Sequence, residues 1–182
     1  MKTISEHVLD IIQNSVRAGA RKIEVTVGED KQEDIFSLLI QDNGCGMDEE
    51  MALQAANPFF TSRKTRKVGL GLALLKQNAE NASGTFSLKS CQGEGTMIKA
   101  VFQHSNIDRP PVGDIWDSLY YTWLSHPEIL IIYRHETLKG QFTMDSDEIR
   151  EMLGDVPIQG SEIRNALVEM IKNNLKEIDA TK

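Results

Sequence analysis

Two polar residues near the start of the chain could hold a cation. Asp10 and Asn14 lie four residues apart in the segment 4–16, whose apolar residues recur at helical spacing. A helix would place both side chains on one face, which Arg17 continues. Because Asn offers one oxygen and Asp two, such a pair can orient a water molecule and ligate a hard cation. A polar helix face in solvent would also explain the pair.

A glycine-rich turn follows an apolar run and could admit a flat ligand. Asp42 begins the sequence DNGCGM directly after the run 37–40. A carboxylate at the end of a strand can accept a hydrogen bond from an exocyclic amine, and Gly44 and Gly46 would let the backbone approach a flat ring closely. The letters DNG also occur in ordinary turns.

A basic stretch leads into a pair of glycines that would open a helix. Residues 63–67 carry four positive side chains with no acid between them, and Gly69 and Gly71 follow. Helix N-termini bind phosphates through free N–H groups and the helix dipole, and flanking Lys and Arg side chains add charge-assisted hydrogen bonds. A solvated basic loop is the alternative. The spacing matches neither a Walker loop nor the Rossmann fingerprint.

The elements that must position these residues follow from the periodicity of the apolar side chains. In the first part of the chain we expect helices over 4–16, 48–55 and 68–81, and strands over 22–27, 35–41, 85–89 and 96–103. The order helix, strand, strand, helix, helix, strand, strand favours an α+β fold. We expect a two-layer sandwich with helices on one face of a mainly antiparallel sheet.

The second part of the chain predicts a smaller unit. Two prolines in a polar stretch are typical of a linker. We therefore expect a domain over 1–104, a linker over 105–113 and a small acidic α+β module over 114–182 that serves docking or partner binding. Within it the patterns predict helices over 117–125, 146–153 and 161–178 and strands over 128–135 and 140–144. The apolar stripe of the last helix could pack within the chain or form a homodimer.

Composition argues against several classes of protein. The 182 residues include 20 Lys and Arg against 27 Asp and Glu, a net charge of −7, which disfavours nucleic-acid binding. Apolar runs are far shorter than a membrane span needs, and the first ten residues lack the apolar region of a signal peptide. Two cysteines, Cys45 and Cys91, fit a reducing compartment. We therefore expect a cytoplasmic protein without a membrane partner.

Taken together and in this order, the segments resemble the ATP site of the GHKL superfamily, which has the Bergerat fold. That superfamily includes gyrase-type topoisomerases, heat-shock chaperone ATPases, sensor histidine kinases and the mismatch-repair protein MutL. The resemblance covers about residues 4–103 and is closest to histidine kinases, with a MutL-like N box. Five motifs carry it: Asn14-Ser15 with Ala18-Gly19-Ala20, Asp42-x-Gly44-x-Gly46, Pro58-Phe59-Phe60-Thr61, Gly69-Leu70-Gly71-Leu72 and Gly93-Glu94-Gly95-Thr96.

The resemblance implies a role for each matching residue. Asn14 would ligate the Mg²⁺ that bridges the ATP phosphates, and Asp10, where relatives carry Glu or Asn, would be the general base or would polarise water. Asp42 would bind the adenine amine, with Thr96 closing a water-mediated contact to the same edge. The other residues implied to contact the nucleotide are Gly44, Gly46, Met47, Phe60, Thr61, Lys64, Lys67, Gly69, Leu70, Gly71 and Leu72.

Departures from the superfamily narrow the function that the resemblance implies. A sensor kinase carries a helical hairpin with a phosphoacceptor histidine upstream of the site, whereas here the site helix starts within a few residues of Met1. We therefore expect Mg-ATP-dependent phosphotransfer to a separate protein, or ATP hydrolysis, without a phosphoacceptor domain in the chain. The alternative is an ATP-sensing switch with little turnover, similar to anti-sigma factors. Structural roles are expected for the four histidines, His7, His104, His126 and His135.

Overall fold

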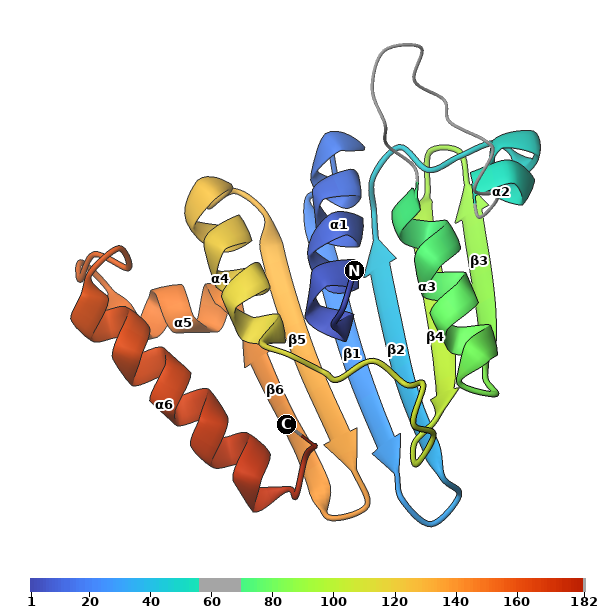
Figure 1. Cartoon of the computed structure of the whole chain (residues 1–182). Coiled ribbons are helices and arrows are strands. Elements are labelled where there is room, and N and C mark those ends of the chain that lie inside the picture. The colour runs from blue at the N-terminus through green and yellow to red at the C-terminus, as the bar shows by residue number, and fades with distance from the viewer. Residues whose placement is uncertain (56–69, 182) are drawn as a thin grey trace.

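The fold is one six-stranded sheet that carries helices α1, α3 and α4 on one face (Figure 1). The structure, a computed structural model, describes residues 1–55 and 70–181. The helices are α1 (Ile4–Arg17), α2 (Glu49–Ala55), α3 (Leu70–Asn81), α4 (Ile115–Ser125), α5 (Ser146–Leu153) and α6 (Ser161–Glu177). The strands are β1 (Lys22–Asp30), β2 (Ile35–Asp42), β3 (Thr85–Cys91), β4 (Gly95–Gln103), β5 (Leu130–Thr137) and β6 (Gly140–Asp145).

The strand order in the sheet is β3-β4-β2-β1-β5-β6, and only the pair β1 with β5 is parallel. This arrangement confirms the expected α+β fold with helices on one face of a mainly antiparallel sheet. Asp42, the last residue of β2, lies opposite Ile23 on one side and Thr96 on the other. The register therefore places two residues expected at the nucleotide site next to each other.

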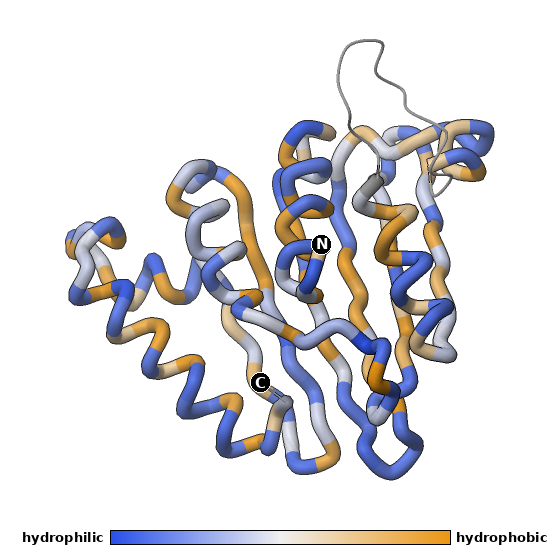
Figure 2. Tube along the Cα trace, viewed as in Figure 1, coloured by the Kyte–Doolittle hydropathy of each residue, from blue (hydrophilic) through white to orange (hydrophobic). Residues whose placement is uncertain are grey.

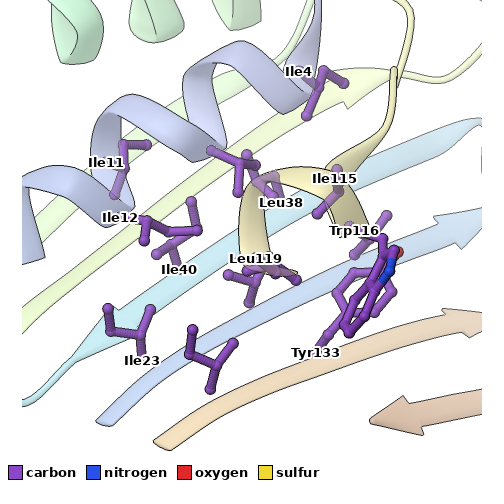
Figure 3. Packing of buried hydrophobic residues seen from close by; sticks show 14 of the residues in the cluster. Ile4, Ile11, Ile12, Ile23, Leu38, Ile40, Ile115, Trp116, Leu119 and Tyr133 are labelled. Carbon is purple, nitrogen blue, oxygen red and sulfur yellow. The ribbon is translucent and has the colours of Figure 1, made fainter. Parts of the chain in front are cut away.

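One face of the sheet is buried because the inner strands alternate apolar with polar side chains. In β1, every second residue is buried, beginning with Ile23. Successive side chains of a strand point to opposite faces, so this alternation turns a continuous apolar surface toward the helices. Figure 3 shows Ile11 and Ile12 of α1 lying over Ile40 of β2 and Ile23 of β1. This packing fixes α1 against the centre of the sheet.

The same core continues into the second part of the chain. Trp116 and Leu119 of α4 and Tyr133 of β5 belong to the hydrophobic cluster that holds α1 (Figure 3). β5 pairs with β1 along its whole length. The ranges 1–104 and 114–182 therefore share one sheet and one core, while their division into a domain and a module stays a prediction.

Helix α6 packs on this core through few residues. Figure 2 shows apolar residues recurring along α6 between hydrophilic ones, and of its 17 residues only Leu167 and Ile171 are buried. Its remaining apolar side chains are partly exposed where they meet the cluster. Across residues 1–55 and 70–181, no helix is both long and apolar enough to span a membrane.

Candidate functional site

The candidate site lies where the end of α1, the end of β2 and the start of α3 meet (Figure 1). Thr3 caps the start of α1, and Gly19, at φ +73°, follows its end. Between them the buried apolar face of α1 packs on the sheet. The helix thereby directs Asp10 toward α3 and Ser15 toward β2, whereas Asn14 lies exposed.

A donor on each oxygen holds the carboxylate of Asp42 in place. Ser15 Oγ donates to Oδ2 at 2.6 Å, and the N–H of Gly44 donates to Oδ1 at 2.9 Å. A carboxylate has about four acceptor positions, so each oxygen retains one for a ligand. Asp42 is half-buried and can therefore accept a hydrogen bond from an N–H group at this end of the sheet.

Ser90 organises the region beside Asp42, and the sequence analysis did not single it out. Its Oγ donates to Gly95 O at 2.9 Å, accepts the N–H of Met47 at 2.9 Å and lies 2.8 Å from Thr96 Oγ1. Because the single proton of Ser90 is used on Gly95, Thr96 donates to Ser90 and keeps its own acceptor positions. The sequence alone does not indicate the role of Ser90, because its contacts to Gly95 and Thr96 form only when β3 pairs with β4.

Two glycines let the loop after β2 pack backbone against backbone on the β3–β4 turn. A Cβ placed at Gly46, where φ is +62°, would lie 2.0 Å from Cys91 O. A Cβ at Gly95, where φ is +113°, would lie 2.0 Å from Asp42 O. Both positions are therefore closed to any other residue unless the backbone moves. Close packing alone therefore accounts for a glycine at position 46, whether or not the ring of a ligand also lies beside it.

The carboxylate of Asp10 reaches the first turn of α3. A Cβ placed at Gly71 would lie 1.9 Å from Asp10 Oδ2, so a residue without a side chain fits while the carboxylate keeps this position. Leu72 in the same turn packs against the core and holds the helix start in place. The first N–H groups of a helix have no partner inside it and bind anions. The structure thus brings Asp10 together with the turn that is expected to bind phosphates.

Asn14 is exposed on α1, one turn beyond Asp10. Its Oδ1 accepts a hydrogen bond from an Nη of Arg17 at 2.7 Å, and Arg17 Nε donates to Gln13 O at 2.9 Å. One of the two lone pairs of the amide oxygen expected to ligate Mg²⁺ is therefore used, and a cation on the other would lie close to the positive guanidinium of Arg17. In the described part of the chain, no three His, Cys, Asp or Glu side chains gather into a ready-made metal site.

Some of the expected residues cannot be placed. The structure describes Leu70 as the first residue of α3. The basic stretch 63–67 lies outside the described residues. The same holds for five residues that the resemblance assigns to the nucleotide, Phe60, Thr61, Lys64, Lys67 and Gly69.

His7 links α1 to α3 one turn before Asp10. The side chain is buried, and its Nε2 lies 2.9 Å from Asn78 Nδ2 of α3. Burial lowers the pKa of His7 from its ordinary value, so the imidazole is neutral at pH 7. His7 therefore serves the structural role that the sequence favours: it sets the position of α3, and with it the turn at Gly71.

Comparison with known proteins places these features in context. The family model described as histidine kinase-, DNA gyrase B-, and HSP90-like ATPase matches residues 2–106. A probable C4-dicarboxylate sensor kinase of Bacillus subtilis is 34% identical over 88 residues, which are 48% of this chain and 16% of that protein. The tetrathionate sensor histidine kinase TtrS of Salmonella typhimurium is 34% identical over 106 residues, 56% of this chain and 17% of that protein. The match therefore spans about one-sixth of these relatives.

Solved structures share the fold. The ATPase domain of Aquifex aeolicus MutL complexed with ADP has a TM-score of 0.50 at 13% identity and covers 84% of this chain and 69% of that chain. The N-terminal domain of a DNA repair protein has a TM-score of 0.53 at 16% identity and covers 79% of this chain and 52% of that chain. These likenesses confirm the fold expected from the motifs.

Proposed function

We propose that this chain, which belongs to the histidine kinase-, DNA gyrase B-, and HSP90-like ATPase family, binds Mg-ATP and transfers the γ-phosphoryl group to a separate protein or to water. The observation that carries the proposal is the position of the Asp10 carboxylate against Gly71. A proton acceptor there stands beside a helix start that can bind phosphates. Asp42, which accepts a hydrogen bond from Ser15 of α1, supplies an acceptor for the adenine base.

In this proposal Asp42 recognises adenine. Ser15 and Gly44 each hold one of its oxygens, and each oxygen keeps a position for the exocyclic amine or for a water molecule. Thr96 offers a further acceptor toward the same edge, because its proton goes to Ser90. Guanine has a carbonyl oxygen where adenine has the amine, and two acceptors cannot pair. We therefore expect the site to prefer ATP over GTP.

The first turn of α3 binds the phosphates in this proposal, and Asn14 binds the metal. The N–H groups of Gly71 and Leu72 have no partner within the described part of α3, because they lie in the first turn of Leu70–Asn81. Asn14 Oδ1 is the proposed Mg²⁺ ligand once Arg17 has released it. Bound Mg²⁺ would neutralise the negative charge of the phosphates. The family motifs alone assign the remaining contacts to Phe60, Thr61, Lys64, Lys67 and Gly69.

Asp10 accepts the proton of the attacking group. When the attacking atom bonds to the γ-phosphorus, the bond from that phosphorus to the bridging oxygen breaks, and ADP leaves with the electron pair. The proton of the attacking group passes to the carboxylate of Asp10. General-base catalysis of this kind contributes about 10²- to 10⁴-fold to a rate, which sets the loss expected when Asp10 is changed.

The proposed acceptor is a group outside the described part of this chain. His7 and His135 are buried, and His104 is hydrogen bonded to the buried carboxylate of Glu29. These three imidazoles are held in structural contacts. His126 is the C-cap residue of α4. The relatives named above are sensor kinases, which supports a protein as the phosphoryl acceptor.

An Asp10→Asn variant tests the proposed chemistry. The protein is incubated with Mg²⁺ and ATP labelled at the γ-phosphate, and ADP formation and ATP affinity are both measured. We expect ADP formation to fall about 100-fold or more, with ATP affinity unchanged within about twofold, because the amide keeps the shape but cannot accept the proton. Glu6→Gln, an exposed acid on the same helix, is the matched control and should retain full turnover. Equal turnover in Asp10→Asn and the intact protein would contradict the role of Asp10.

The hydrogen bond between Arg17 and Asn14 favours a second candidate, an ATP-sensing switch with little turnover. Mg²⁺ on Asn14 would release the exposed Arg17 side chain and so change a charged surface at the end of α1. A partner protein could respond to that change without any hydrolysis. An intact protein that binds Mg-ATP but forms ADP no faster than a protein-free control would support the switch and reject transfer of the phosphoryl group to water.

A further inference from the structure

A cavity lies away from the candidate nucleotide site, between α6, β5 and the segment 112–116. Its volume is about 690 Å³, within the range of roughly 300–1,000 Å³ that is usual for small-molecule sites. Apolar side chains form most of its wall, among them Ile115, Tyr133 and Ile171. None of the described residues expected at the ATP site lines it.

The cavity exists because α6 is fastened to the fold at its two ends. Near its start, Arg164 pairs with Asp117 of α4. Beyond its end, Ile178 O accepts a hydrogen bond from Thr137, and Thr181 N donates to the buried Glu29 at 2.7 Å. The middle of the helix spans the space between these contacts. The chain thus holds the cavity open with hydrogen bonds and an ion pair.

Trp116 leaves a polar atom without a partner in the wall of this cavity. Its side chain is 4% exposed, and Nε1 has no hydrogen-bond partner among the residues that the structure describes. A buried donor without an acceptor is unfavourable, so such groups are usually paired with protein, water or ligand. Figure 3 shows the indole of Trp116 beside the ring of Tyr133. Because Nε1 is itself inaccessible to solvent, a ligand oxygen in the cavity can satisfy this donor only after the neighbouring side chains shift.

Most of the other polar groups of the wall are already hydrogen bonded or carry positive charge, and Asn173 is a neutral exception. His135 uses both ring nitrogens, Nε2 on Glu29 and Nδ1 on the hydroxyl of Tyr133, each at 2.8 Å. The carboxylate of Asp179 pairs with two lysines, and that of Asp114 caps α4. Two exposed lysines of α6, Lys172 and Lys176, also line the cavity, and neither forms an ion pair within the described ranges. The two lysines thus give this wall positive charge that could attract an anion, and the amide of Asn173 adds a neutral donor and acceptor.

We propose that this cavity binds a small carboxylic acid with an apolar body. The body packs against the apolar wall, and the carboxylate accepts a hydrogen bond from Trp116 Nε1 and faces Lys172 and Lys176. Such a ligand bridges α4 and α6, so it tightens a helix that otherwise buries only Leu167 and Ile171. This site is independent of the proposed ATP site, because it shares no residue with it.

Titration of the intact chain with decanoate, followed by calorimetry without nucleotide, tests the proposal. Decanol and decyltrimethylammonium serve as probes with the same tail and a neutral or positive head. We expect decanoate to bind with one site per chain and the other two at least about tenfold more weakly, since both the hydrogen bond and the lysines select an anion. No binding of decanoate at millimolar concentration, or equal affinity for all three probes, would overturn the proposal.

Substitutions in the cavity wall test whether decanoate binds in this cavity. Trp116→Phe keeps a ring but removes the donor and should weaken decanoate about tenfold. Trp123→Phe is the matched control, because Trp123 is equally buried on α4 but does not line this cavity. The double change of Lys172 and Lys176 to Gln alters exposed side chains, so the fold is retained, and it should also weaken decanoate. Decanoate affinity that neither change lowers would reject this cavity as the site.

Discussion

Replacing Gly46 by alanine tests how tightly the loop after β2 packs on the β3–β4 turn. The new Cβ would lie 2.0 Å from Cys91 O and 3.0 Å from Gly95 O, both backbone atoms, so the loop must move by roughly 1 Å or more. Positive φ costs alanine about 1 kcal/mol, and displacing a packed backbone costs about 1–3 kcal/mol. We therefore expect the free energy of unfolding to fall by about 2–4 kcal/mol.

The same displacement should weaken ATP binding. The N–H of Met47 donates to Ser90 at 2.9 Å, and this bond ties the loop to β3, whose Ser90 also contacts Thr96 of β4. We expect about a tenfold loss of ATP affinity when it breaks, since a net hydrogen bond is worth about 1 kcal/mol and the adenine edge shifts with it.

Gly93→Ala measures the cost of a positive φ without the steric contact that a Cβ at Gly46 would make. Gly93 lies in the same turn at φ +84°, but a Cβ there would meet nothing within 4 Å. It should therefore lose only about 1 kcal/mol and keep its ATP affinity. Urea unfolding and ATP titration of the two variants measure the difference. If Gly46→Ala lost no more stability than Gly93→Ala, the reasoning from the Cys91 contact would be refuted.

Three further predictions concern charge and the phosphate end of the site. Burial alone would raise the pKa of Glu29, but hydrogen bonds from two histidines and a threonine lower it from 4.5 to about 2. Stability of about 3 kcal/mol should therefore be present above pH 4.5 and be lost as the pH falls toward 2, and acid unfolding of Glu29→Gln should lack this loss. Gly71→Ala should change the free energy of unfolding by no more than about 1 kcal/mol, because the methyl group displaces the side chain of Asp10 and alanine favours helices. ADP formation by the same variant should fall about tenfold, because the carboxylate of Asp10 is displaced. Unchanged ADP formation would argue against a role for the contact between Asp10 and Gly71. Arg17→Ala should free Asn14 and lower the Mg²⁺ concentration needed for ATP binding about two- to fivefold, whereas a higher Mg²⁺ requirement in the same titration would contradict this.

Local patterns predicted most of the elements. Apolar spacing and glycine punctuation placed α1, β2 and α3 within a few residues of their observed bounds, because each buries one face and ends at a turn residue. Gly19, which follows the C-cap residue of α1, has a φ of +73°, a conformation that glycine adopts readily. The parallel pairing of β5 with β1 could not be predicted from local patterns. It places Lys22 opposite Leu130, and no local sequence signal specifies which strand of a sheet a distant hairpin will pair with.

At the site, residue types were predictable and their contacts were not. Asp42 stood out because an acid precedes two glycines, yet its hydrogen bond to Ser15 depends on how α1 lies over β2. The approach of Asp10 to Gly71 depends in the same way on the packing of α1 against α3. Ser90 carries no motif at all. Such contacts join segments far apart in the chain, so tertiary packing decides them.

Calorimetric titration of ATP, with and without Mg²⁺, on the intact chain and on Asp42→Asn tests whether this site binds the nucleotide. We expect Mg²⁺-dependent binding of ATP that Asp42→Asn weakens at least about tenfold, because the amide replaces a charged acceptor at the adenine edge. Asp48→Asn, which changes an exposed acid in the following loop, should bind as the intact chain does. Absence of binding at millimolar ATP, or equal affinity in Asp42→Asn, would contradict the claim that this site binds ATP.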